Sequence, residues 1–262
     1  MRRGKGFTLV ELLVVIGVIA VVAAFLLPSV KSARSQAQQV LCANRLRQLA
    51  AAAINYGIDN HGVLPPGTRD AGDQGEHCIW INRAVYTYFV KQVGSMPAPN
   101  LPAGQNGIGD AALACPNLYG NDSNPVPFDA PSGIGWVIGY NYLGNHKLID
   151  RNNNWPVPSP IKLTDRGSLP LFSDLNDWSP IDRWTIVPHQ RVGGGGFFYG
   201  ADGGKMPSQH GASGGNVAFL DGSVRWKIVG RRIDAIRYGE MFIYATASYP
   251  GGGFNDTYLG LW

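Results

Sequence analysis

The chain opens with one long apolar run, from Phe7 to Leu27. These 21 residues contain one ionisable side chain, that of Glu11. A helix of this length spans roughly 31 Å at about 1.5 Å per residue, which is close to the hydrocarbon thickness of a bilayer. Because an acid in hydrocarbon costs about 2.5 to 3.5 kcal/mol, it normally marks a site with a specific partner. The run predicts a membrane-spanning helix, with Glu11 as its candidate functional residue.

A second pattern continues the helix beyond Pro28, which ends the uninterrupted apolar run and favours a kink. Residues 29–56 contain no glycine or proline, and apolar side chains recur there at steps of four and three. They form a stripe on one helix face, made by Cys42, Leu46, Leu49, Ala53 and Tyr56. The pattern predicts one helix of about 50 residues that ends near Gly57 or Gly62, and two separate helices are the alternative.

After residue 62 the pattern changes to short apolar segments between loops rich in glycine and proline. Helices are expected at Trp80 to Val93 and at residues 231–238. Strands are expected at residues 136–142, 169–173, 197–199 and 241–247. Pro170 suggests an edge position for its strand, because proline lacks the N–H group that a neighbouring strand would need. The elements predict an α+β fold, in which the second half of the long helix packs on a mostly antiparallel sheet with long loops.

The clearest local pattern is a β-hairpin. Residues 216–220 and 223–229 are strand-like, and Asp221 and Gly222 between them are a preferred pair for a two-residue type I′ turn. Apolar and basic side chains alternate along the second strand. We expect the apolar set to face the core and the basic set to face solvent: Val224, Trp226 and Ile228 against Arg225 and Lys227.

Composition fits a loop-rich domain outside the cytoplasm better than a helical cytosolic enzyme. Charged residues make up only 15% of the chain, which has 35 glycines and 18 prolines. The formal charge is +4, but without residues 1–6 the chain has 19 Lys and Arg against 18 acids. Basicity therefore gives little support to nucleic acid binding, and mostly reflects a segment that holds its end of the span in the cytoplasm.

A cut after Gly6 would create a partner of the right sign for Glu11. It frees an α-amino group on Phe7, four residues before Glu11, so that the amine and the carboxylate lie on one helix face. They can pair within one subunit or between packed neighbours. A cleaved secretory signal has a similar basic start, but its apolar region is usually only about 7 to 15 residues long. A plain membrane anchor is the other alternative.

This segment resembles the leader and first helix of type IV prepilins and type II secretion pseudopilins, over Lys5 to Ile16 with Pro28 closing the run. The resemblance implies cytoplasmic cleavage between Gly6 and Phe7 by a prepilin peptidase, followed by N-methylation of Phe7. It also implies a single pass through the inner membrane with the N-terminus in the cytoplasm. Other pilin or pseudopilin subunits would then be the partners in a periplasmic or cell-surface filament, in which Glu11 neutralises the Phe7 amine of an adjacent subunit.

Residues 42–49 narrow the resemblance to a prepilin-like group whose C-terminal domain is named for an H-x9-DG motif. His210, Asp221 and Gly222 match the residue types of that motif, but ten residues rather than nine lie between His210 and Asp221. We expect structural roles for all three residues. Asp221 and Gly222 supply the turn, and His210 hydrogen-bonds local backbone.

Three cysteines, Cys42, Cys78 and Cys115, are an odd number for an oxidising compartment. Cys78 and Cys115 both follow the long helix and are the candidate disulfide pair. Cys42 lies at helical spacing among apolar neighbours, so it is expected to be a small buried side chain. The sequence has no CxxC motif or His/Cys ligand spacing, which argues against a structural zinc site.

Other candidate sites are weaker. Asp174, Asp177 and Asp182 form an acid-rich segment that is a candidate Ca²⁺ site, although its spacing matches no EF-hand. Ser213 lies in a G-x-S-x-G match that lacks the strand–serine–helix order of hydrolases. A basic cluster on and after the hairpin is expected to be a solvated face or a subunit contact, not a DNA site. It comprises Arg225, Lys227, Arg231, Arg232 and Arg237.

We therefore expect a leader at residues 1–6, a transmembrane or filament-core helix at 7–28, an amphipathic continuation at 29–62 and an extracytoplasmic domain at 63–262. The expected function is non-catalytic and needs no cofactor. It is that of a structural subunit of a type IV pilus or a type II secretion pseudopilus. The alternative is a membrane-tethered binding or adhesion domain that uses the pilin export route.

Overall fold

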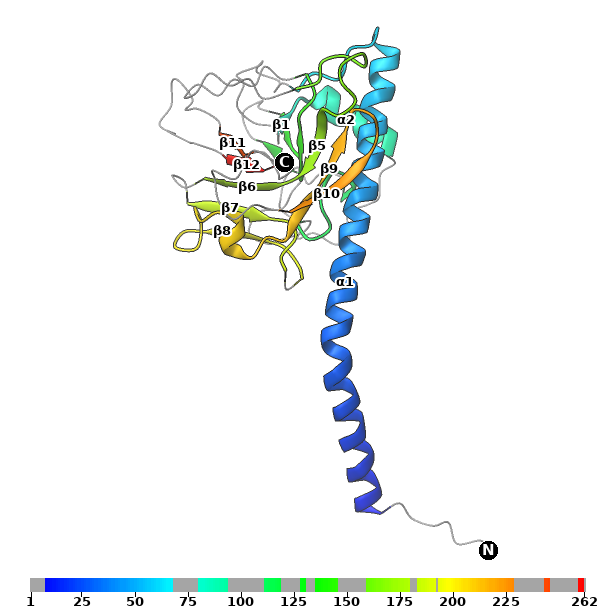
Figure 1. Cartoon of the computed structure of the whole chain (residues 1–262), viewed down its shortest axis with the longest axis vertical. Helices are drawn as coiled ribbons and strands as arrows, with labels where there is room; N and C mark the ends of the chain where they lie inside the picture. Colours follow the sequence, from blue (N-terminus) through cyan, green and yellow to red (C-terminus); the bar gives the residue numbers. More distant parts are fainter. Residues whose placement is uncertain are drawn as a thin grey trace, which may run out of the picture.

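The computed structural model describes a long N-terminal helix that carries a β-rich head at its C-terminal end (Figure 1). The head denotes the described residues after residue 62. The structure describes residues 8–67, 80–93, 111–118, 128–130, 135–145, 159–179, 183–191, 193–228, 243–245 and 259–261. The helix predicted at residues 231–238 lies outside them and stays a prediction.

Helix α1 runs from Leu9 to Asp59 without interruption, a length of 51 residues or about 77 Å. It continues through Pro28, so the prediction of one helix is confirmed and the alternative of two helices is wrong. The predicted kink at Pro28 stays a prediction. The backbone N–H groups of Asn60 and Gly62 donate to the Gly57 carbonyl, and Gly62 has a φ of 82° that glycine adopts without strain. The helix therefore ends between Gly57 and Gly62, the two glycines that the sequence indicated.

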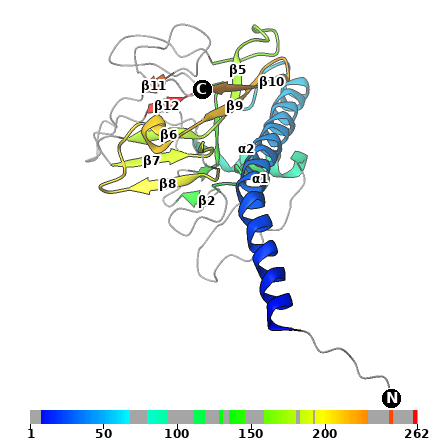
Figure 2. The same cartoon turned by 60° about the horizontal axis from the view of Figure 1, so that its bottom comes forward.

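The two halves of α1 differ in what covers them. The large apolar side chains from Leu9 to Leu27 are exposed, with Phe25 at 79%. Further along, Leu46 and Leu49 of the predicted stripe are fully buried and pack into the core of the head. Figures 1 and 2 show the head lying against only the C-terminal half of the helix. The predicted stripe is thus the face that the head covers.

Three antiparallel sheets build the head within the described residues. The four-stranded sheet has the order β10-β9-β5-β4, and its strands β9 and β5 pack against α1. A five-stranded sheet, β11-β12-β6-β7-β8, lies farther from the helix (Figure 2), and a three-stranded sheet has the order β1-β3-β2. The strands are β1 (Trp80–Ile81), β2 (Phe128–Ala130), β3 (Gly135–Val137), β4 (Tyr140–Tyr142), β5 (Pro170–Asp174), β6 (Asn176–Ser179), β7 (Trp184–Val187), β8 (Gly196–Tyr199), β9 (Gly214–Phe219), β10 (Val224–Ile228), β11 (Ile243–Ala245) and β12 (Leu259–Leu261).

Short helices complete the head: α2 (Arg83–Val93), η1 (Ala111–Leu113) and η3 (Pro207–His210). Helix α2 confirms the helix predicted at Trp80 to Val93, although it starts later because Trp80 and Ile81 pair with β3. Strands β8 and β11 confirm the segments at 197–199 and 241–247, whereas β12 was not predicted. The predicted α+β class, with a long helix on antiparallel sheets, is confirmed.

The predicted strand at residues 136–142 is two strands in two different sheets. Gly139 separates them, and its backbone forms a parallel bridge with Ala114. A Cβ atom at Gly139 would lie 2.6 Å from the Cα of Ala114, so only glycine allows this approach. The break redirects the chain from β3 to β4, and a continuous apolar run in the sequence does not reveal it.

The edge position suggested by Pro170 is wrong. Strand β5 lies between β4 and β9, and all five of its residues are buried. Pro170 is its first residue, where the pairing with β9 shifts in register between Pro170 and Phe172. The missing N–H group is tolerated at a strand start and a bulge, even inside a sheet.

The predicted hairpin exists, but its turn differs. Strands β9 and β10 pair with Val224 opposite Ala218. The Phe219 N–H donates to the Ser223 carbonyl, and the Gly222 N–H donates to the Phe219 carbonyl. Gly222 has a φ of 79°, whereas Asp221 is not in the left-handed region. The connection is therefore a three-residue loop with glycine in the αL conformation, and the two-residue type I′ turn is wrong.

Strand β10 is also less buried than its alternation predicts. Trp226 is 36% exposed and Ile228 is 65% exposed, so they do not form the expected core face. Both basic side chains instead extend over the ring of Phe219, at 5.4 Å for Arg225 and 5.5 Å for Lys227. Strand β10 is the edge of its sheet, where alternation alone does not guarantee that another layer covers the apolar face.

We expect Leu46→Ala to destabilise the head by about 2 to 5 kcal/mol, because it deletes a fully buried side chain and leaves a cavity. Leu41→Ala is the matched control on the same helix, since Leu41 is 44% exposed, and its effect should stay within about 0.5 kcal/mol. Urea unfolding of the detergent-solubilised chain, followed by tryptophan fluorescence, measures both. Equal losses in the two variants would contradict the assignment of the buried face.

Candidate functional site

The N-terminus of α1 holds Glu11 in a capping box with Thr8. The Thr8 N–H and hydroxyl donate to Glu11 Oε2 at 2.8 Å and 2.7 Å, and the Glu11 N–H donates to the Thr8 hydroxyl at 3.3 Å. These contacts satisfy donors that a helix N-terminus otherwise leaves unpaired. They also hold the carboxylate at the first turn, one turn from the predicted cleavage point. Gly6 and Phe7 lie outside the described residues.

The apolar half of α1 is long enough and apolar enough to cross a membrane, and none of its most apolar stretch is buried. No side chain of the described head covers Leu9 to Leu27. A soluble monomer rarely exposes an apolar surface of this size. This half of the helix therefore needs lipid or other apolar helices around it, and Glu11 is the acid within it.

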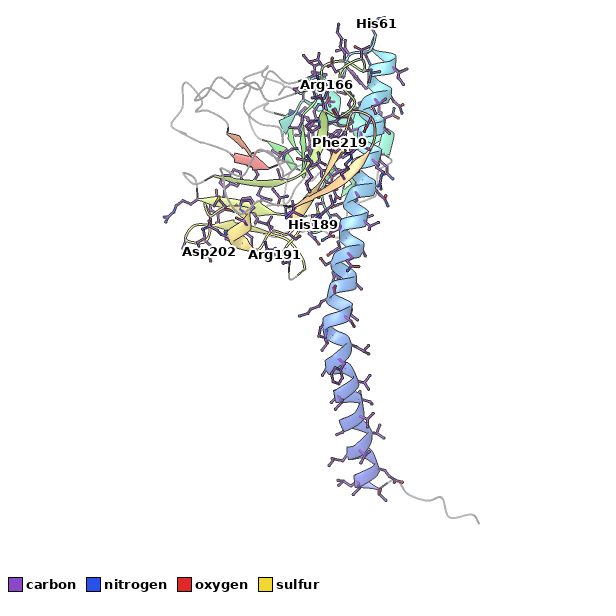
Figure 3. All side chains as sticks on the ribbon, viewed as in Figure 1. His61, Arg166, His189, Arg191, Asp202 and Phe219 are labelled. Carbon is purple, nitrogen blue, oxygen red and sulfur yellow. The ribbon has the colours of Figure 1, made fainter. Side chains whose placement is uncertain are left out.

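A second group of polar side chains lies buried where the head meets α1, and we call it the junction cluster. It consists of Cys42, Cys115, Asp174, His189 and Asn216. The Sγ atoms of Cys42 and Cys115 lie 2.7 Å apart, and His189 Nε2 lies 3.7 Å from Cys115 Sγ. Figure 3 shows His189 at the side of the head that faces the helix. Four separate parts of the chain after α1 supply members of this cluster, so sequence spacing could not reveal it.

Asp174 is the anion of the junction cluster. Its Oδ2 lies 3.2 Å from His189 Nε2 and accepts from the Asn216 N–H at 2.7 Å. Asn216 Nδ2 donates to the same oxygen at 3.0 Å and to the carbonyl of Gln39 on α1 at 3.2 Å. The carboxylate thereby connects β5, β9 and the segment after β7, while Asn216 connects them to the helix.

The protonation of His189 follows from its two neighbours. Burial alone would lower the pKa of His189, but hydrogen bonds to Asp174 and Cys42, together with the Asp174 charge, raise the pKa to about 10. On the other side of the ring, Asn117 Nδ2 donates to the Pro188 carbonyl and lies 3.3 Å from Nδ1. Because Asn117 Nδ2 is a donor, its contact favours the neutral ring with an unprotonated Nδ1, whereas the Asp174 charge favours the imidazolium. In both forms Nε2 carries a proton that faces Asp174.

The residues of the predicted C-terminal motif have separate local surroundings. His210 ends η3, and its ring stacks on Phe198 with centroids 4.0 Å apart. Burial lowers the pKa of His210, and a hydrogen bond to the Asp202 backbone opposes this effect. Asp221 accepts from the Ser223 N–H at 2.8 Å and so stabilises the turn that Gly222 completes. These contacts are those of structural residues, and no acid–base pair between His210 and Asp221 is present among them.

The candidate calcium ligands do not form the expected loop. Asp174 ends β5 and is fully buried in the junction cluster, and Asp177 lies in β6 opposite Ile186. Both acids therefore occupy strands, because the apolar pattern on either side extends the sheets through them. Asp182 lies outside the described residues, as does Cys78, so the calcium site and the Cys78–Cys115 disulfide stay predictions. Cys42 is buried as expected, yet its neighbour is another sulfur atom.

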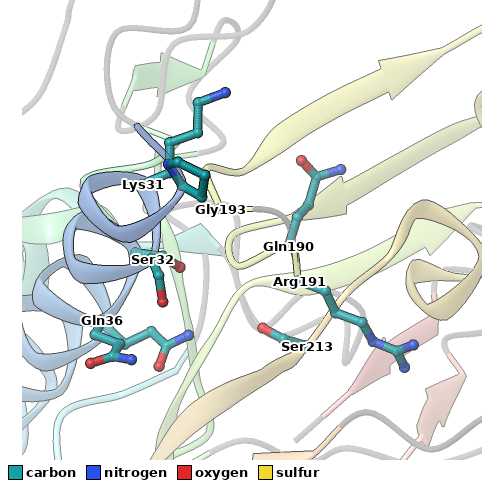
Figure 4. A pocket seen from close by; sticks show the side chains of 10 residues that line it. Lys31, Ser32, Gln36, Gln190, Arg191, Gly193 and Ser213 are labelled. Atoms are coloured by element: carbon teal, nitrogen blue, oxygen red, sulfur yellow. The ribbon is translucent and has the colours of Figure 1, made fainter. Parts of the chain in front are cut away.

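A cleft of about 590 Å³ lies between α1 and the segment from Gln190 to Gly193. Ser32, Gln36 and Ser213 are among the residues that line it. Figure 4 shows the charged ends of Lys31 and Arg191 extending in different directions out of the gap. The cleft therefore presents amides and hydroxyls and does not concentrate positive charge for an anionic ligand.

Asp174→Asn is expected to flatten the dependence of stability on pH. Because the Asp174 carboxylate outweighs the opposing effect of burial and raises the pKa of His189 above 6.5 on folding, the folded state binds more protons in this range and loses stability as pH rises. The contribution is complete below pH 6.5. We expect the native chain to lose about 1 to 2 kcal/mol between about pH 6.5 and pH 8, and the variant to lose much less.

Urea unfolding at the two pH values measures this difference, below the range in which most thiols ionise. Asp165→Asn is the control, since Asp165 is a surface acid that accepts from the backbone N–H groups of Ile161 and Lys162, and it should keep the native slope. A native slope in Asp174→Asn would contradict the coupling between Asp174 and His189.

Comparison with known proteins finds similarity to pilus and secretion components. Residues 1–27 match the family described as the prokaryotic N-terminal methylation motif. The chain is 43% identical over 61 residues to the type IV wide pilus major component PilA4 of Thermus thermophilus, covering 23% of this chain and 47% of the relative. It is 36% identical over 59 residues to the type II secretion system core protein G of Pseudomonas aeruginosa, covering 22% of this chain and 42% of the relative. The chain thus spans about half the length of these curated relatives, and no solved structure matches it.

These matches agree with the geometry of α1. The methylation motif covers the apolar half of the helix, which is exposed and carries Glu11 in its first turn. The long helix on antiparallel sheets is a pilin-like arrangement. The chain is therefore a prepilin- or pseudopilin-like protein.

Proposed function

We propose that this chain is a structural subunit of a type IV pilus or a type II secretion pseudopilus, assembled through the apolar half of α1. The observation that carries the proposal is that an exposed apolar half-helix, with one acid in its first turn, projects from a folded head. The similarity to PilA4 and to secretion protein G supports the same role. The role requires no catalysis, no bound cofactor and no nucleic acid.

Processing would complete the assembly site. A prepilin peptidase would cut between Gly6 and Phe7, and methylation would follow on the new Phe7 amine. Thr8 stays in the mature chain, so the capping box that positions Glu11 survives the cut. The peptidase therefore changes the charge at the helix N-terminus while the carboxylate keeps its place.

The Phe7 amine and Glu11 would then pair between neighbouring subunits. A carboxylate in an apolar layer is destabilising by about 2.5 to 3.5 kcal/mol on insertion scales, and a partner amine offsets that cost. Moving an apolar helix from lipid into a bundle of similar helices changes its apolar contacts little, because lipid tails and leucine side chains are about equally apolar. The ion pair thus decides which helices join and in what stagger, and the head stays outside the bundle.

We propose an inner-membrane pool of subunits with the N-terminus in the cytoplasm and the head on the far side. Basic residues at positions 2, 3 and 5 precede the span, which favours this orientation. The alternative function, from a different class, is that of a tethered binding or adhesion domain that uses the same export route. Such a protein would not depend on Glu11 for activity.

Glu11→Ala is expected to abolish incorporation into filaments, because the Phe7 amine of the adjacent subunit would lose its counter-ion. Glu11→Gln should fail equally, since it keeps an acceptor for Thr8 but removes the charge. Both variants should still be cleaved and methylated, which mass spectrometry of the mature N-terminus measures. Sheared filaments probed with an antibody to the head measure incorporation.

Val10→Ala is the matched control, because Val10 is an exposed apolar neighbour in the same turn, and it should assemble normally. A Glu11→Ala subunit that still enters filaments would refute the proposed assembly. A native chain that keeps residues 1–6 in its working form would refute the processing step. Activity of the head without any filament would favour the tethered binding domain.

A further inference from the structure

Two cysteines that are far apart in the sequence meet inside the head. Cys42 lies on α1 and Cys115 follows η1, 73 positions later, and their Sγ atoms are 2.7 Å apart. Both side chains are fully buried. Assembly through the apolar half of α1 uses neither thiol, so the pair calls for a role of its own.

Two hydrogen bonds to backbone carbonyls next to Cys115, one from α1 and one from the segment after β3, hold the two sulfur atoms together. Cys42 lies on the helix face that the head buries. Arg45, one turn further along α1, donates from Nη1 to the Ala114 carbonyl at 2.6 Å. The Gly139 N–H donates to the Leu113 carbonyl at 2.8 Å. The peptide that carries Cys115 is therefore fixed between α1 and the segment after β3, so that the sulfur atoms stay adjacent unless the head leaves the helix.

The geometry disfavours a shared metal ion. Cys42, Cys115 and His189 offer ligand atoms within 4.8 Å of one another, and zinc accepts such donors. A tetrahedral zinc ion with Zn–S bonds of about 2.3 Å would hold its sulfur atoms roughly 3.8 Å apart, whereas they lie 2.7 Å apart here. His189 Nε2 carries a proton and faces Asp174 Oδ2 at 3.2 Å, so it offers no lone pair to an ion.

We propose that Cys42 and Cys115 form a disulfide that joins α1 to the head covalently, which replaces the Cys78–Cys115 pair expected from the sequence. The inference rests on the proposed function in one respect, because export of the head places its thiols in an oxidising compartment. As the S–S bond forms, the two thiols lose two protons and two electrons. The disulfide of an envelope thiol oxidoreductase accepts them by exchange and becomes two thiols.

The bond forms before the core closes. In the folded head both sulfur atoms are inaccessible to an oxidoreductase, and burial raises the pKa of the Cys42 thiol, so the reactive thiolate is disfavoured. For the same reason the bond resists reductants until the head unfolds. The disulfide links the head directly to α1, the helix that enters the filament. The head therefore cannot detach from this helix when the filament is under tension.

Peptide mapping of the full chain tests the pairing directly. Trypsin separates the three cysteines onto residues 35–45, 70–83 and 92–147, which contain Cys42, Cys78 and Cys115 respectively. The chain is extracted from membranes without reductant, unfolded in urea in the presence of N-ethylmaleimide so that any free thiol is alkylated, and then digested. A linked pair of 35–45 with 92–147 is expected. A linked pair of 70–83 with 92–147, or three alkylated cysteines in an exported head, would overturn the proposal.

Single substitutions give a second readout. Cys42→Ser and Cys115→Ser should each leave the partner thiol open to alkylation after unfolding. Each should also lower the melting temperature by roughly 10 °C, because the bond closes a long loop. Cys78→Ser is the matched control and should keep both the linked peptides and the melting temperature. An equal loss in all three variants would contradict the Cys42–Cys115 pairing.

Two further measurements separate failure of this inference from failure of the proposed function. Protease access to the head in spheroplasts reports export, and refolding of the reduced chain in detergent with a glutathione redox pair reports pairing without export. Correct pairing on refolding supports the disulfide even where a cytoplasmic head refutes the proposed topology. An exported head that holds stoichiometric zinc, measured by elemental mass spectrometry, would overturn the disulfide.

Discussion

The structure depends on the packing of the C-terminal half of α1 against the four-stranded sheet. Leu46 and Leu49 lose all contact with solvent there, and the strands β9 and β5 supply the other surface. Burial of apolar surface is the dominant favourable term in folding and has no preferred direction. The N-terminal half of α1 is more apolar still, yet no described part of the head covers it. The two halves of one helix therefore lie in different environments, and the head packs only against the amphipathic half.

Local patterns made this division predictable from the sequence. The apolar run with Glu11 and the stripe with Leu46 and Leu49 each depend on residues within a few turns of one another, so periodicity alone reveals them. The end of the helix at Asp59, shortly before Gly62, follows equally from the backbone freedom of glycine. The two strands of the hairpin were predictable in the same way. The turn was not, because Asp-Gly fits a three-residue loop as well as a two-residue one.

The remaining features depend on contacts between distant parts of the chain. Pro170 indicated an edge strand, but its place inside the sheet follows from a register shift that only the pairing with β9 creates. Trp226 lies on the apolar face that the alternation predicts and is still partly exposed. Alternation alone does not ensure that another layer of the protein covers that face. The junction cluster is the extreme case. Its members come from α1, β5, β9 and two connecting segments, and no ligand spacing in the sequence predicts that they lie together.

The apolar stripe and the junction cluster have different roles: the stripe attaches the head to α1, and the cluster fixes its position along the helix. Apolar packing attaches the head to α1, but because it is non-directional it would tolerate a shift of the head by one helical turn. Hydrogen bonds are directional. Asn216 reaches the Gln39 carbonyl only at one position along α1, and it is held there by Asp174, which is itself fixed by His189. A shift would leave buried polar groups unpaired at about 1 to 3 kcal/mol each. The polar cluster thus sets the height of the head above the apolar half of the helix, and in a helical filament that height determines where neighbouring heads meet.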